Sequence, residues 1–66
     1  MMTDQEAYDK LKAERPGIVH ALELRAKDFR NADSLAGFVA NPSDSIELYQ
    51  MIRQAARVVF RAMRIE

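Results

Sequence analysis

Residues 45–65 read SIELYQMIRQAARVVFRAMRI and form the clearest helical pattern in the chain. At about 100° per residue, their apolar side chains fill one unbroken arc of roughly 220° around the helix axis. The arc consists of Leu48, Tyr49, Met51, Ile52, Ala55, Ala56, Val58, Val59, Phe60, Ala62, Met63 and Ile65. A surface helix needs an apolar stripe of only about 100°. The apolar surface beyond that stripe has to be buried against more than one neighbouring helix. A chain this short can hardly supply them all, so we expect copies of it to associate.

The opposite face of this helix carries a stripe of arginines that lie within about 80° of one another. They are Arg53, Arg57, Arg61 and Arg64. A guanidinium presents a planar fork that binds phosphate through two parallel hydrogen bonds, and the aromatic rings that border the stripe can stack on a base. We therefore select as candidate ligand-binding residues Tyr49, Arg53, Arg57 and Arg61. The alternative is that the arginines face solvent or pair with the acidic first half of the chain.

The length of the chain limits how stable one copy can be. Sixty-six residues make a single domain, residues 1–66, whose core supplies only a few kcal/mol. The chain has no cysteine and one histidine, His20, so disulfides are excluded and a histidine metal site within one copy is not expected. Oligomerisation is the stabilising device that remains, in agreement with the wide apolar arc.

The charges indicate no general attraction to nucleic acid or membranes. Ten basic and ten acidic side chains cancel, although the acids lie mostly in the first half of the chain and the arginines near its end. There is no apolar run of transmembrane length and no visible signal peptide. We expect a soluble protein of the cytoplasm, without a membrane partner.

Two helices are expected before the arginine-bearing one. Thr3 and Glu6 have the spacing of a capping box, which predicts a short helix over residues 4–14 that ends before Pro16. Gaps of three and four residues then predict a long helix over residues 18–40. Its seam consists of Ile18, Leu22, Arg25, Phe29, Ala32, Ala36 and Val39. On its outer face, Glu23 and Lys27 are spaced as an i,i+4 ion pair.

The weak point of this second helix is residues 31–34, where Asp33 or Ser34 has the character of an N-cap. Two short helices are therefore the alternative to one long helix. After it, Asn41 and Pro42 predict a turn, and Ser43 or Asp44 is expected to cap a last helix over residues 44–65. The predicted fold is all-α, with two long helices in an antiparallel hairpin, a short N-terminal helix, and assembly into a homo-oligomeric bundle.

No enzyme chemistry is indicated by the residue pattern. Ser34, Ser43 and Ser45 fall where helix caps or turn residues are expected, and His20 lies opposite the apolar seam. No spacing matches a zinc, magnesium or phosphate-loop site. We therefore expect a non-enzymatic protein without a cofactor.

The last helix resembles one in the phage anti-CBASS sponge family, whose hairpin domain also occurs in a class of phage Thoeris inhibitors. The matching residues are Tyr49, Ile52, Arg53, Gln54, Ala55, Val58, Val59, Phe60, Arg61, Ala62 and Met63. The chain departs from the family pattern at Gln50 and Arg57, and residues 3–14 have no counterpart in it.

This resemblance implies a helical hairpin assembled into a homo-hexamer or a similar oligomer. Cyclic di- or trinucleotides, the signals of bacterial immunity, would bind between subunits without being cleaved. Tyr49, Arg53 and Arg57 would contact their phosphates and bases. The alternative is a small oligomeric helical module that regulates or inhibits by binding a host protein or nucleic acid.

Overall fold

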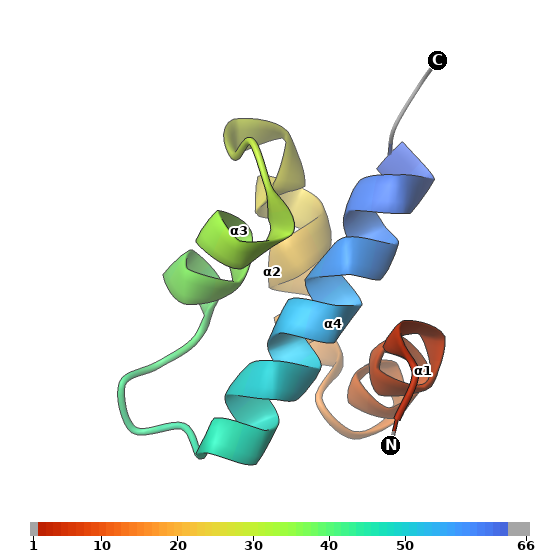
Figure 1. The fold of residues 1–66 in the computed structure, drawn as a ribbon, viewed down its shortest axis with the longest axis vertical. Coiled ribbons are helices and arrows are strands. Elements are labelled where there is room, and N and C mark those ends of the chain that lie inside the picture. Colours follow the sequence, from red (N-terminus) through yellow and green to blue (C-terminus); the bar gives the residue numbers. More distant parts are fainter. Residues whose placement is uncertain (1, 64–66) are drawn as a thin grey trace.

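The computed structural model describes residues 2–63 and shows helices arranged around a central one. The elements are α1 (Asp4–Glu14), α2 (Pro16–Arg25), the 3-10 turn η1 (Ala26–Asp28), α3 (Ala32–Val39) and α4 (Ile46–Met63). Helix α4 runs between α1 and α3, with α2 behind it (Figure 1). The all-α prediction is confirmed. None of the helices in this part of the chain combines the length and the apolar character needed to cross a membrane.

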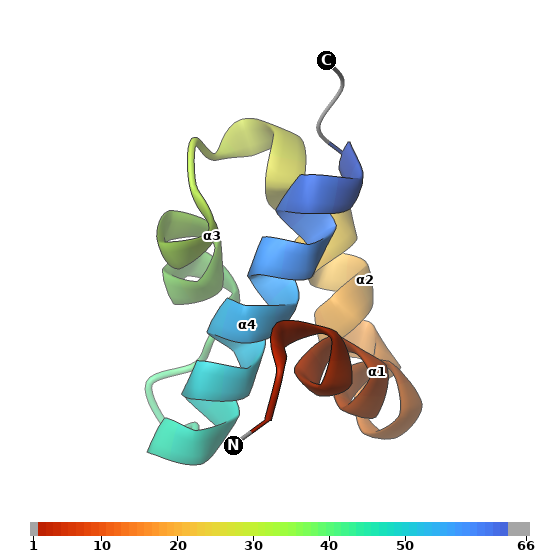
Figure 2. The same cartoon turned by 45° about the vertical axis from the view of Figure 1, so that its right-hand side comes forward.

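Helix α1 forms where the sequence predicts it, and it begins with a complete capping box. The Glu6 amide donates to Thr3 Oγ1 (3.1 Å), and the Thr3 amide donates to Glu6 Oε1 (2.8 Å). These bonds lower the pKa of the Glu6 carboxyl below its ordinary value, because they favour the charged form. The helix lies across α4 (Figure 2) and buries Ala7 and Leu11.

The predicted continuous helix over residues 18–40 is wrong, and the two-helix hairpin with it. Helix α2 ends at Arg25, η1 follows, and the backbone is extended at Phe29 (φ −126°, ψ 153°). A straight helix over residues 18–40 would be about 34 Å long, whereas the longest dimension of the molecule is 33 Å. Such a continuous helix would also cover only one side of α4. The break lets α2 and α3 pack on different sides of α4, so the alternative of two short helices is confirmed.

The cap of α3 is Asn31, not Asp33 or Ser34 as predicted. Asn31 is extended, and its Oδ1 accepts a hydrogen bond from the Ser34 amide at 2.8 Å. Because Asn31 is the cap, the helix begins at Ala32. Leu35 and Ala36 then face the core, where both are fully buried.

Helix α4 is capped by Ser45 and not by Ser43 or Asp44. The Leu48 amide donates to Ser45 Oγ at 3.1 Å, whereas Asp44 Oδ2 accepts from the Asn41 amide at 2.9 Å and holds the preceding turn. The helix therefore begins at Ile46 rather than at residue 44. Arg64 and Ile65, which we placed in this helix, lie outside the described residues.

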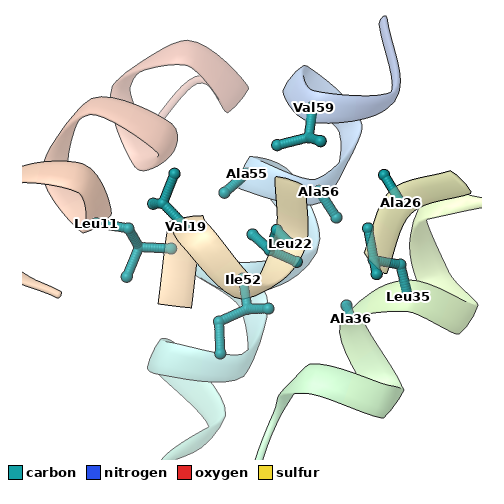
Figure 3. Packing of buried hydrophobic residues seen from close by; sticks show 10 residues of the cluster. All are labelled: Leu11, Val19, Leu22, Ala26, Leu35, Ala36, Ile52, Ala55, Ala56 and Val59. Carbon is teal, nitrogen blue, oxygen red and sulfur yellow. The ribbon is translucent and has the colours of Figure 1, made fainter. Parts of the chain in front are cut away.

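The core draws on all five elements, and Figure 3 shows its side chains converging between them. It consists of Leu11, Val19, Leu22, Ala26, Leu35, Ala36, Ile52, Ala55, Ala56 and Val59. Ala55 and Ala56 are fully buried, and Ala62 and Met63 are the only exposed members of the apolar arc among the described residues, so one chain covers much of the arc by itself. The premise that other copies must cover that arc is thereby weakened, and association of copies stays a prediction.

Tyr8 joins α1 to α2 through a hydrogen bond from its hydroxyl to Glu23 Oε2 at 3.0 Å. The bond to this carboxylate raises the pKa of Tyr8 above its ordinary 10.0. A raised folded-state pKa means that the bond contributes its full stability below pH about 10 and loses it as the pH rises through the folded value.

In a Tyr49→Phe background, which leaves Tyr8 as the only tyrosine, we expect phenolate absorbance to titrate with a midpoint above 10.0. Adding Glu23→Gln removes the charged acceptor and should move the midpoint back toward the ordinary value. An unchanged midpoint in the Glu23→Gln variant would contradict the bond.

Candidate ligand-binding groove

A groove of about 570 Å³ lies between the segment that links α2 to α3 and the C-terminal half of α4. Its chemistry is given by four cationic and two aromatic side chains. They are Lys27, Arg30, Arg57, Arg61, Phe29 and Phe60. Among the residues that the structure describes, no acidic side chain lines it. The groove therefore favours anions that also carry a flat apolar group.

The break after α2 creates one wall of this groove. Because the chain leaves the helix at Arg25, Lys27 and Arg30 come to face the end of α4. Phe29 stacks at a tilt on Phe38, with ring centroids 5.2 Å apart. The predicted Glu23–Lys27 ion pair is not formed, because Lys27 lies beyond the end of α2 and Glu23 accepts from the Tyr8 hydroxyl instead.

The other wall belongs to α4, whose Arg57 and Arg61 both reach the same carboxylate on α1. Arg57 Nη1 lies 3.2 Å from Asp4 Oδ1, and Arg61 Nη2 lies 3.3 Å from Asp4 Oδ2. The side chains of Arg57 and Arg61 remain 41% and 70% exposed. Ion pairs this exposed contribute roughly 0–1 kcal/mol each, so they orient the guanidiniums more than they stabilise the fold.

Arg53 and Tyr49 lie apart from this groove. Arg53 Nε donates to Asp33 Oδ1 on α3 at 3.0 Å, and this bond raises the pKa of the guanidinium above its ordinary value. Tyr49 lines a second, smaller groove together with Pro42 and Ile46. Of the four predicted site residues, the structure therefore brings together only Arg57 and Arg61.

Arg53, Arg57 and Arg61 each pair with an acid from the first half of the chain, as the alternative interpretation of the stripe predicts, and whether the stripe binds a ligand stays a prediction. Both acids, Asp4 and Asp33, lie in the first turn of a helix that flanks α4. Arg64 lies outside the described residues. Sequence reasoning missed Lys27, Phe29 and Arg30, because they reach the groove only through the break.

The cationic side chains that line the groove are of the kind that suits an anion. Ser45 is used as a helix cap, and His20 is exposed on α2, as expected. Between residues 2 and 63, no three histidine, cysteine, aspartate or glutamate side chains come together as metal ligands. A comparison of the chain with protein-family models, curated proteins and solved structures found no match.

Proposed function

We propose that this protein is a non-enzymatic binder of a phosphate-bearing nucleotide, which it holds intact in the groove between the α2–α3 link and α4. One observation carries the proposal: four cationic side chains and two phenylalanines line a single groove. Guanidinium forks suit phosphate oxygens, and an aromatic ring offers a stacking surface that accepts any base.

The resemblance of the last helix to the anti-CBASS sponge family makes cyclic di- and trinucleotides the first ligands to test. Such a protein acts by keeping an immune signal away from its receptor, and it needs no catalytic group to do so. In the family the pocket lies between subunits. A second copy that closed the open side of this groove would bury more of a ligand than one chain alone.

The test is a calorimetric titration of the protein with cyclic di- and trinucleotides, ADP, inorganic pyrophosphate and adenosine. We expect the phosphate-bearing compounds to bind, adenosine to bind far more weakly, and the affinity to fall as salt screens the groove. Mass spectrometry of the ligand released by denaturation should return it unchanged. Flat titrations across the phosphate-bearing compounds would overturn the proposal, and a cleaved ligand would overturn its non-enzymatic part.

A second candidate function, a helical module that binds a protein or nucleic acid, is favoured by a different observation. Phe38 is 60% exposed on α3, and the Arg25 guanidinium lies 5.9 Å from the centre of its ring. Exposed aromatic and arginine side chains are common anchors at protein interfaces. A module of this kind would leave the titrations with all of these small compounds flat, so the same experiment separates the two candidates.

A further inference from the structure

The groove already has an internal anion beside it, the carboxylate of Asp4. One oxygen of Asp4 lies 3.2 Å from Arg57 and the other lies 3.3 Å from Arg61, and both of these arginines line the groove. The side chain of Asp4 is only 21% exposed. The carboxylate thus stands against the two guanidiniums as the phosphate of a ligand would.

A phosphate that approaches these guanidiniums meets a like charge. Either it shares the arginines with Asp4 and is repelled by the carboxylate, or it replaces the carboxylate. Replacement is favoured because Asp4 offers each arginine a single oxygen and carries one negative charge, whereas a phosphate group carries more charge and has enough oxygens to accept bidentate hydrogen bonds.

We infer that Asp4 is a built-in competitor for the groove: it sets the affinity for phosphate, and a bound phosphate ligand displaces it and loosens the first turn of α1. This inference rests on the proposed function. The rest of α1 stays attached, because Leu11 is in the core and the Tyr8 hydroxyl is bonded to Glu23. Only the Asp4 contacts have to be exchanged for those of the ligand.

The decisive experiment compares Asp4→Asn with Asp33→Asn in titrations with pyrophosphate and ADP. The two variants change the net charge equally, and each removes a carboxylate from the first turn of a helix that flanks α4. Asp33, however, pairs with Arg53, which lies outside the groove. We expect Asp4→Asn to bind both probes roughly 3- to 10-fold more tightly than the wild type, and Asp33→Asn to stay within about two-fold of it.

Hydrogen exchange supplies a structural readout of the displacement. The Ala7 amide donates to the Thr3 carbonyl at 3.0 Å and reports on the first turn of α1. Saturating pyrophosphate should speed its exchange in the wild type. The Tyr49 amide, which donates to the Ser45 carbonyl in the first turn of α4 and lies outside the groove, should exchange at an unchanged rate.

The outcomes of these experiments distinguish the competitor role of Asp4 from the proposed nucleotide-binding function. If pyrophosphate binds and binding depends on Arg57 and Arg61, but Asp4→Asn binds no more tightly than Asp33→Asn, the competitor role is overturned and the nucleotide-binding function stands. An Ala7 amide that exchanges no faster with saturating pyrophosphate overturns the displacement. Flat titrations in the wild type and both variants overturn the function and the competitor role together.

Discussion

Replacing Ile52 by aspartate is expected to unfold the chain. Ile52 is 0% exposed and lies in the middle of α4, within the core shared by all the helices. An unpaired charge at such a position costs several kcal/mol. At about 0.05–0.15 kcal/mol per residue, a chain of 66 residues has a total stability of roughly 3–10 kcal/mol. The expected result is a helical circular-dichroism signal that is small and shows no cooperative melting transition.

Ile46 provides a matched control on the same helix. It is 74% exposed and is the first residue of α4. Aspartate at that position makes the same chemical change, and a negative charge near a helix N-terminus is favourable. The Ile46→Asp variant should therefore melt with a stability within about 0.5 kcal/mol of the wild type. Cooperative melting of Ile52→Asp close to the wild-type temperature would contradict the placement of Ile52 in the core.

The same substitution bears on the association of copies. From the sequence we expected other copies of the chain to cover part of the apolar arc, which contains Ile52 and Val59; aspartate at either position would then dissociate the assembly and largely unfold it. The structure buries both residues within one chain, and unfolding of the Ile52→Asp variant therefore requires no interface. Association is tested instead by the wild type, because the melting temperature of an oligomer rises with protein concentration.

The parts of the fold that were predictable have strong local signals. The capping box at Thr3 and Glu6 and the proline at position 16 fix α1 from its first residue to its last. The long apolar arc of α4 identifies the face that the core uses, including Ile52 and Val59. In both cases the decisive interactions lie within a few residues along the chain, so a sequence pattern captures them.

The break between α2 and α3 depends on contacts that no local pattern encodes. The apolar spacing across residues 18–40 suits a single helix, and Leu22 and Ala36 are buried as that spacing predicts. The break is favoured because it places two helices on different sides of α4 and lets Asn31 cap the second one. Tertiary packing here overrides a helical period, which is a common limit of periodicity arguments.

The same limit applies to the candidate site, because part of it is assembled by tertiary contacts that no local sequence pattern encodes. The arginine stripe was visible because it lies on one helix, and two of its members line the groove. Lys27 and Arg30, the cationic residues of the facing wall, could not be connected with the arginine stripe from the sequence. The acids that hold the arginines were anticipated only as a class, because the pairing of Asp4 with Arg57 joins residues 53 positions apart.

Removing the guanidiniums of Arg57 and Arg61 together is expected to abolish nucleotide binding. In the double variant Arg57→Gln, Arg61→Gln, the groove keeps its two phenylalanines but loses both guanidinium groups that α4 contributes. A hydrogen bond to a charged group contributes about 1.5–3 kcal/mol, so the loss of two gives an expected decrease in affinity of at least about 100-fold for pyrophosphate or ADP. Calorimetric titration measures this change.

The matched control is Arg53→Gln, one turn earlier on the same helix. Arg53 is also bonded to an acid of a flanking helix, but it lies outside the groove, so its replacement should change the affinity by less than about three-fold. The double variant should keep nearly the wild-type melting temperature, because the two arginine side chains that it replaces are 41% and 70% exposed. A folded double variant that still binds pyrophosphate as the wild type does would show that phosphate is bound elsewhere. If Arg57→Lys weakens binding in the same protein, the planar fork is required in addition to the charge, because lysine keeps the charge but makes no bidentate contact.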